Sequence, residues 1–510
     1  MTAATPRSGL LIDGRDYYRA VYEACRRAQR SILMLGWQFD SRARLLVGDE
    51  AAGAAYPVEL LAFLGALCKE RPDLRVHILT WRSSPLFALE REPFQSLTFR
   101  LRSHRNLRFE LDDCHPTTGS QHQKLIAVDR SIAFVGGMDL CTSRWDDRDH
   151  LAGDGRRDRP WPWPGRYLPY HDVQAFVTGD AVDVLREWFA ERWKRGTREP
   201  LALPDAPREE IAIAPSVVIT APRVALTRTL PELEDPPCEA VHELRALHLR
   251  AIAAARASIY IENQYFSSDE IRRALVERMR RGGGVGSTGG EPIEIVIVLP
   301  HQSAGLKEQV AIGVRQAEIL RQLKAVAAQT GHHVGVYYAA APGRDGDVPV
   351  FIHAKVLAVD DRFLLISSAN ATNRSMGLDS ELGLAWEADA AEPSLRAARI
   401  ELLREHVGVG RTEADALLGP QRGLVARLDG IARARSHRLR MHAMCEDAQP
   451  GVSIAHAVRE DVPLDPCGPV FEDLFPEPDE WYRHVRDRMA MVWHRLRTAL
   501  RPGEPGRTAR

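Results

Sequence analysis

Residues 122–129 read HQKLIAVD and residues 353–360 read HAKVLAVD, and these two stretches are the most informative part of the sequence. Each has a histidine, a lysine two positions later and an aspartate five positions after the lysine. Each continues through an apolar run into a turn of small residues, FVGGMD at 134–139 and LISSAN at 365–370. Two copies in matched context indicate a duplicated unit, which a single histidine–lysine pair would not. The chain therefore contains two related halves.

The lysines strengthen this interpretation. The chain holds 68 lysines and arginines, yet only six of them are lysine, and two of the six are Lys124 and Lys355. A chain that uses arginine so heavily keeps lysine where a compact ammonium suits the site better than a planar guanidinium.

The repeat extends beyond the motifs. Residues 28–32 read AQRSI and residues 255–259 read ARASI, and each stretch closes a helical pattern and leads into an apolar run. These stretches lie 227 residues apart, and the two motif histidines lie 231 residues apart. Apolar runs that alternate with amphipathic helices predict an α/β fold. We expect two repeated α/β sandwich domains with mixed sheets, packed about a pseudo-twofold axis with the site between them.

Composition suggests four segments. We expect a first half at residues 1–198 and a second half at 239–408. Residues 199–238 are rich in proline and acidic residues and are predicted to connect the halves. Residues 409–510 are arginine-rich with a helical pattern, which predicts a helical C-terminal extension of unknown role.

The overall charge and the cysteines exclude several classes of protein. A formal net charge of -1 provides no global basic field, so nucleic acid is an unexpected partner. The seven cysteines have no CxxC spacing, so neither a disulfide framework nor a zinc site is indicated. No stretch approaches the ~20 apolar residues of a membrane span, and no signal-peptide pattern begins the sequence. We predict a cytoplasmic protein without a transmembrane segment, whose contact with membrane is peripheral.

Two imidazoles and two ammoniums in one pocket suit phosphoryl-group chemistry. One histidine attacks phosphorus, the other protonates the departing alcohol, and the lysines neutralise the nonbridging oxygens. The motifs bring no carboxylate cluster or Cys/His set that would hold a metal. We therefore expect neither a metal nor another cofactor.

Four carboxylates near the motifs are further candidates. Glu381 and Asp172 each open an apolar run and could fix the tautomer of a histidine, but their spacing is equally consistent with solvated strand ends. Asp129 and Asp360 lie directly before turns, where aspartate commonly accepts hydrogen bonds from backbone. We assign Asp129 and Asp360 a structural role.

Several stretches together resemble one family. The first motif continues into GGMDL and RWDD, and the further matching stretches are PYHDV at 169–173, YIENQYF at 260–266, NRSM at 373–376, DSE at 379–381 and REH at 404–406. In this order they resemble the phospholipase D superfamily, whose mark is the duplicated HxKxxxxD motif, and more narrowly the eukaryotic-type phospholipases D. The resemblance covers about residues 10–408. The chain departs from the pattern at Ser367, where the second motif usually has glycine, and Asp139 takes the asparagine position of the first.

The resemblance implies a role for each candidate. His122 would be the nucleophile that forms a phosphohistidine, and His353 the general acid and then base. Asp172 and Glu381 would orient the two histidines. The phosphate would be contacted by Lys124, Lys355, Asn370 and Ser368.

The expected activity is therefore that of a phospholipid phosphodiesterase. It would release the head-group alcohol at a membrane surface and form phosphatidic acid, with water or a small alcohol as acceptor. A phosphatidyltransferase similar to cardiolipin synthase is one alternative, and a nuclease is another, for which the basic stretch at 100–108 is the one candidate contact. A lipid-binding pseudoenzyme is disfavoured by the intact histidines and lysines.

Overall fold

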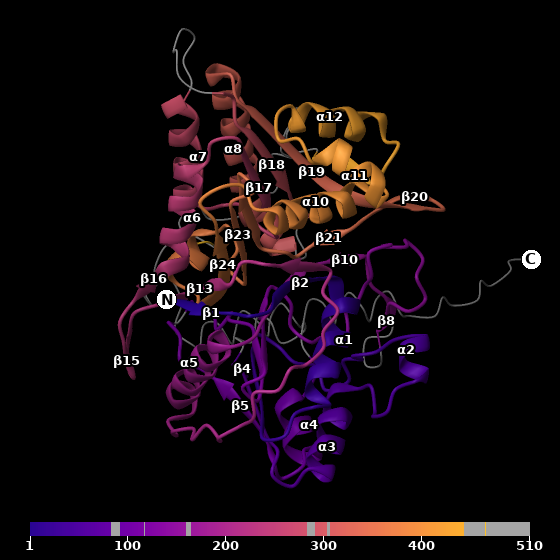
Figure 1. Cartoon of the computed structure of the whole chain (residues 1–510), viewed down its shortest axis with the longest axis vertical. Coiled ribbons are helices and arrows are strands. Elements are labelled where there is room, and N and C mark those ends of the chain that lie inside the picture. The colour runs from indigo at the N-terminus through magenta and orange to yellow at the C-terminus, as the bar shows by residue number, and fades with distance from the viewer. Residues whose placement is uncertain are drawn as a thin grey trace, which may run out of the picture. The chain divides into compact units, whose positions relative to one another are not determined.

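The computed structural model describes residues 1–82, 92–116, 118–159, 165–282, 291–302, 306–442 and 465. Two large mixed β-sheets organise this part of the chain, one in each half (Figure 1). This arrangement confirms the predicted α/β fold with mixed sheets.

The first sheet has eight described strands. In spatial order they are β12 (Val217–Ile219), β2 (Ser8–Ile12), β11 (Val173–Val177), β7 (Ile132–Gly136), β6 (Leu125–Val128), β3 (Ser31–Gly36), β4 (Arg75–Trp81) and β5 (Leu107–Asp112). The first motif supplies β6, and its small-residue turn follows β7.

The second sheet has eleven described strands. Its main order is β1 (Thr2–Ala4), β13 (Arg223–Leu230), β24 (Glu381–Glu387), β23 (Phe363–Ser367), β22 (Val356–Val359), β17 (Ser258–Glu262), β18 (Glu294–Val298), β19 (His333–Gly343) and β20 (Gly346–Pro349). Beside this order, β16 (Val241–His242) pairs with β13 and β25 (Leu439–Met441) pairs with β19. Three small ladders complete the strands: β10 (Tyr170–His171) with β21 (Phe351–Ile352), β14 (Leu233–Glu234) with β15 (Pro237–Cys238), and β8 (Asp158–Arg159) with β9 (Gly165–Arg166).

The two sheets repeat one topology. The order β2-β11-β7-β6-β3-β4-β5 corresponds to β13-β24-β23-β22-β17-β18-β19. In both series the first four pairings are antiparallel and the last two are parallel. Seven strands thus agree in both order and direction, which is the structural counterpart of the repeated sequence.

Helices cover the sheets on both faces. The helices of the first half are α1 (Asp13–Cys25), α2 (Asp49–Ala52), α3 (Leu60–Glu70), α4 (Gln95–Arg102) and α5 (Asp180–Thr197). They are followed by α6 (Glu243–Ala254), α7 (Asp269–Gly282), α8 (Leu306–Thr330), α9 (Asn373–Gly377), α10 (Pro393–Val407), α11 (Arg411–Leu418) and α12 (Leu424–Ala434). Figure 1 shows α6, α7 and α8 along one face of the second sheet and α10, α11 and α12 along the other.

Successive side chains of the strands point to opposite faces of the sheets and pack into three apolar clusters. In β6, Ile126 packs with α1, α3 and α4, whereas the next residue, Ala127, faces a cluster that contains side chains of both halves. In β22, Leu357 packs with α6, α7 and α8, and Ala358 joins the shared cluster. Because successive side chains of a strand point to opposite faces, each motif strand contributes both to its own half and to the shared core.

Asp129 and Asp360 stabilise the turn before each central parallel strand. The buried Asp129 carboxylate accepts hydrogen bonds from the backbone N–H groups of Gln29, Arg30 and Ser31 at 2.7, 2.9 and 2.7 Å. The Asp360 carboxylate likewise accepts from three backbone N–H groups at 2.6, 2.7 and 2.8 Å, those of Arg256, Ala257 and Ser258. The last residue of the motif thus contacts the other repeated stretch in each half.

Segments other than the repeated strands also join the sheets. Residues 199–238, which we expected to act as a linker, supply β12 to the first sheet and all of β13 to the second. The N-terminal strand β1 pairs with β13, so residues 2–4 belong to the sheet of the second half. Within residues 409–442 the chain forms α11, α12 and β25.

The departure at Ser367 is accommodated by its cross-strand partner. In the first sheet Gly136 pairs with Gln174, and a Cβ on Gly136 would lie 2.5 Å from Gln174 Oε1. In the second sheet Ser367 pairs with Gly383. A Cβ on Gly383 would lie 3.0 Å from the Ser367 Cβ. Each pair contains one glycine, on opposite strands in the two halves.

We predict that Asp129→Ala lowers the free energy of unfolding by about 2–4 kcal/mol, because three N–H groups lose their acceptor. Chemical denaturation followed by circular dichroism measures the change. The control is Asp73→Ala, which removes an exposed partner of Arg30 at 3.0 Å and should cost less than about 0.5 kcal/mol. Equal losses in the two variants would contradict a structural role for Asp129.

Candidate active site

The two motif histidines lie directly before the central strands β6 and β22, and each is hydrogen-bonded to the opposite half. The backbone N–H of His122 donates to the carbonyl of Ser380 at 3.0 Å. The backbone N–H of His353 donates to the carbonyl of His171 at 2.8 Å. Ser380 and His171 are the residues before Glu381 and Asp172, so these bonds bring each histidine beside a carboxylate of the other half.

The side chains complete this crosswise arrangement. Nδ1 of His122 lies 2.9 and 3.1 Å from the two carboxylate oxygens of Glu381, and Nδ1 of His353 lies 2.6 Å from Asp172 Oδ2. Both carboxylates are fully buried. Sequence spacing associated Glu381 with the half that contains His353, whereas the contact joins Glu381 to His122. Neither half alone holds a histidine together with its carboxylate.

The two lysines are buried beside the histidines. Nζ of Lys124 donates to the backbone carbonyl of His122 at 3.0 Å and lies 3.6 Å from Asp139 Oδ2. Nζ of Lys355 donates to the backbone carbonyl of His353 and to Gln264 Oε1, the latter at 3.1 Å. The backbone and neighbouring side chains thus hold both ammoniums within the site.

Burial shifts the protonation equilibria of these groups. Burial and the charges of Lys124 and Lys355 hold the pKa of His122 well below its usual value. Burial, with the charges of Lys355 and Arg144, does the same to the pKa of His353. Both imidazoles are therefore neutral at neutral pH. A neutral histidine that donates from Nδ1 to a carboxyl oxygen presents a lone pair on Nε2.

Burial also shifts the pKa values of the carboxylates and of one lysine beside the histidines. Burial raises the pKa of Glu381 to about 8, with a further contribution from the charge of Asp379. Burial raises the pKa of Asp172 to about 6, against the charge of Lys355. Burial also lowers the pKa of Lys355 to about 7.

Ser368 and Asn370 follow β23, but they have different surroundings. The Ser368 hydroxyl donates to Glu381 and accepts from the backbone N–H of Leu382 at 3.0 Å, and the residue is fully buried. The structure therefore places Ser368 against the same carboxylate that contacts His122. Asn370 Oδ1 is buried and has no hydrogen-bond partner among the described residues.

Sequence reasoning missed a buried ionic cluster behind Asp172. Nδ1 of His171 lies 2.6 Å from Glu405 Oε1 and 2.9 Å from Asp13 Oδ1, and its Nε2 lies 2.9 Å from Glu262 Oε2. His150 contacts the same Glu405 oxygen at 3.2 Å. The resembling stretches contained three of these five residues, His171, Glu262 and Glu405, but only their convergence in three dimensions reveals the cluster.

The ionic cluster also bears on metal binding. The ligand atoms of Asp13, His150, His171 and Glu405 lie within 4.8 Å of one another. Two imidazole nitrogens and two carboxylate oxygens form a donor set that a divalent cation could use. In the structure these groups form ion pairs with one another, and Arg148 lies 3.7 Å from Glu405 Oε2.

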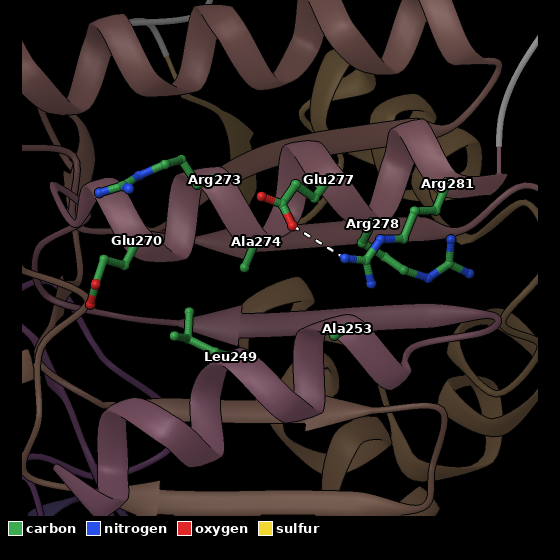
Figure 2. Close-up of a pocket in the computed structure, with 8 residues that line it drawn as sticks. All are labelled: Leu249, Ala253, Glu270, Arg273, Ala274, Glu277, Arg278 and Arg281. Carbon is green, nitrogen blue, oxygen red and sulfur yellow. Dashed lines mark hydrogen bonds and ion pairs between the residues drawn. The ribbon is translucent and has the colours of Figure 1, made fainter.

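Other surface features lie apart from the histidines. Figure 2 shows a groove of about 310 Å³ between α6 and α7, lined by Leu249, Ala253, Glu270, Arg273, Ala274, Glu277, Arg278 and Arg281. The basic stretch at 100–108 runs from the end of α4 into β5, where Arg108 forms ion pairs with Glu110 and Glu199. No described helix has the length and apolar character needed to cross a membrane.

Comparisons with known proteins agree with this site. The family described as "Cardiolipin synthase, PLD-like domain" matches residues 248–397. Phospholipase D2 of Bos taurus is 24% identical over 516 residues, which cover 79% of this chain and 53% of that protein. Cardiolipin synthase A of Pseudomonas fluorescens (strain SBW25) is 28% identical over 388 residues, which cover 74% of this chain and 64% of that protein. This chain thus spans between about half and two thirds of these two relatives.

A solved structure shows the same fold. The crystal structure of phosphatidylserine synthase from Haemophilus influenzae Rd KW20 superimposes with a TM-score of 0.54 at 13% identity, covering 85% of this chain and 95% of that one. The duplicated motifs, the repeated sheets and these relatives lead to one conclusion. The family match and the relatives support this chain as a member of the phospholipase D superfamily.

Proposed function

We propose that this protein is a phospholipase D-type phosphodiesterase that removes the head-group alcohol from a phospholipid and forms phosphatidic acid. The observation that carries the proposal is the crosswise pairing of His122 with Glu381 and of His353 with Asp172. It provides two oriented imidazoles with buried ammoniums beside them. Relatives named phospholipase D, cardiolipin synthase and phosphatidylserine synthase support phosphodiester chemistry in this fold.

In the first step His122 acts as the nucleophile. Its Nε2 forms a bond to phosphorus while the bond from phosphorus to the head-group oxygen breaks. His353 donates a proton to the departing alcohol, and the negative charge of the bound phosphodiester favours the protonated form of this histidine. Lys124, Lys355 and Asn370 hold the nonbridging oxygens as negative charge builds.

In the second step the roles of the histidines change. His353, now neutral, takes a proton from an incoming water molecule while the water oxygen attacks phosphorus. The bond between phosphorus and His122 breaks, and phosphatidic acid leaves. A small alcohol that enters instead of water yields a phosphatidyl alcohol by the same proton transfers.

The cellular setting follows from the substrate. A phospholipid must be reached at a membrane surface, so we propose peripheral contact between a cytoplasmic protein and the membrane. Transfer to the hydroxyl of a second lipid is the competing activity, because the family description and one relative carry the name cardiolipin synthase. Incubation with phosphatidylglycerol separates the two, since hydrolysis gives phosphatidic acid and lipid-to-lipid transfer gives cardiolipin. Single-stranded DNA in a parallel assay tests nuclease activity.

We predict that a primary alcohol diverts product from phosphatidic acid to a phosphatidyl alcohol, in proportion to its concentration. A covalent phosphohistidine admits whichever hydroxyl reaches the pocket, and the two histidines and two lysines do not distinguish water from a small alcohol by charge. Product ratios and the configuration of a chiral thiophosphate provide the measurements. Inversion at phosphorus without captured alcohol would falsify the double displacement.

We predict different losses for the two histidine variants. His353→Ala should retain part of the first step when the leaving group is p-nitrophenolate, which needs little protonation, whereas His122→Ala should be inactive on every substrate. A burst of p-nitrophenolate measures the first step. Labelled phosphohistidine recovered at His353 in the wild type would reverse the assigned roles.

We predict that Glu381 makes stability dependent on pH. A folded pKa of about 8 means that the native state keeps a proton that the unfolded chain releases near pH ~4.3. The resulting stabilisation is complete below the pKa of Glu381 in the unfolded chain, and it is lost as pH rises through the folded pKa of about 8. The stability advantage of the wild type over Glu381→Gln should fall by roughly 1.4 kcal/mol per pH unit between pH ~6 and ~7 and level off above pH 8.

Urea denaturation across this pH range measures the difference. The control is Glu387→Gln, which alters an exposed glutamate at the other end of the same strand. A wild-type advantage over Glu381→Gln that does not vary with pH would show that Glu381 is already ionised in the folded protein.

A further inference from the structure

The two halves surround the phosphate position with different side chains. The second half places Asn370 after its small-residue turn and Ser375 five residues later. At the corresponding positions the first half has Asp139 and Arg144. The Asp139 side chain is 1% exposed and that of Arg144 is 14% exposed, so both belong to the interior of the site.

Asp139 holds two cations with one oxygen. Its Oδ1 accepts a hydrogen bond from the backbone N–H of Trp37 at 3.0 Å. Its Oδ2 lies 3.2 Å from Arg144 Nη1 and 3.6 Å from Lys124 Nζ. An ionised carboxylate only accepts hydrogen bonds, whereas the amide of Asn370 can also donate. At this position the first half therefore needs another donor for a phosphate oxygen.

Arg144 has donors available for that purpose. A guanidinium carries five N–H donors, and with the described residues Arg144 makes only the contact to Asp139. The neighbouring Tyr170 hydroxyl is buried and has no hydrogen-bond partner in the described part of the chain. The Tyr170 ring lies 5.4 Å from the His353 ring, centroid to centroid. A buried hydroxyl without a partner is costly, and an anionic ligand in the site could accept from Tyr170 as well as from Arg144.

The charge of Arg144 also acts on the groups beside it. It helps to hold the pKa of His353 below its usual value, after burial and Lys355. It also opposes the rise that burial imposes on the pKa of Tyr170. The charge of Arg144 therefore acts on both His353 and Tyr170.

We propose that Arg144 binds a nonbridging oxygen of the substrate phosphodiester as a third cation, and that Asp139 positions Arg144 and Lys124 for this contact. The inference rests on the proposed function, since it assigns a ligand to the same phosphate. The planar guanidinium can offer two parallel N–H donors to phosphate, which an ammonium cannot. His353 then protonates the leaving alcohol next to this fixed positive charge.

Four variants test the proposal: Arg144→Ala, Arg144→Gln, Arg144→Lys and, as control, Arg130→Ala. Arg130 is a partly exposed residue of the turn after β6 that pairs with Asp183 at 2.9 Å. Binding of inorganic phosphate by calorimetry and turnover of a short-chain phosphatidylcholine are both measured. We expect Arg144→Ala and Arg144→Gln to weaken phosphate binding about 10- to 100-fold and to lower kcat/KM about 100-fold. Arg144→Lys should recover part of this loss, and Arg130→Ala should match the wild type.

A double variant separates binding of phosphate from neutralisation of Asp139. Asp139→Ala/Arg144→Ala removes both charges and adds no donor, so phosphate binding should stay weak. Wild-type affinity and turnover in this variant would overturn the proposal, as would unchanged phosphate binding in Arg144→Gln. Thermal unfolding verifies that each variant is folded, and Arg144→Gln decides the result if the double variant is not. Phosphate binding that depends on Arg144 in a protein that cleaves no phospholipid would contradict the proposed function alone.

Discussion

The site depends on the exchange of carboxylates between the two halves. His122 contacts Glu381 and His353 contacts Asp172, and each contact is accompanied by a backbone hydrogen bond to the residue before the carboxylate. A histidine whose Nδ1 is held in this way has a defined tautomer and ring orientation. The relative position of the two sheets therefore sets the distance between the imidazoles.

The ionic cluster around His171 lies directly behind this exchange. Asp13 comes from the start of α1, whereas Glu262 and Glu405 come from β17 and α10 of the other half. Burying such charges carries a desolvation cost of several kcal/mol for each ion, so net stability is a weak reason to retain them. A better reason is placement, because His171 is the residue before Asp172 and its carbonyl accepts the N–H of His353. The cluster restrains the strand end that carries both contacts.

The sequence was sufficient to predict the α/β fold with mixed sheets and the duplication, because the motif strands and the AQRSI and ARASI stretches repeat at nearly constant spacing. It could not predict that Glu381 belongs with His122, since chain spacing carries no information about contacts between halves. Residues 199–238 show another limit. The short apolar run that forms β12 lies in a proline-rich context, and its edge position becomes clear only when the sheets are assembled.

Ser368 and Arg144 show that the contacts of a side chain carry information that its residue type and sequence position do not. Ser368 was predicted to contact phosphate beside Asn370, and in the structure its hydroxyl is hydrogen-bonded to Glu381 and to the backbone of Leu382. Arg144 stands in a matching stretch but lies outside both eight-residue motifs. Only its contact with Asp139, beside Lys124, places it in the site.

The pairs Gly136 with Gln174 and Ser367 with Gly383 constrain how the two halves could diverge. A residue larger than glycine at position 136 would meet both the Gln174 side chain and the carbonyl of Val173, at 2.5 and 2.6 Å. Exchanging a single strand between the halves would therefore create a clash in one sheet and a void in the other. After duplication, the order of substitutions in such a pair matters: one strand must lose its side chain before the facing strand can gain one. Epistasis of this kind makes the paired strands, more than single residues, the units that can be recombined between the halves.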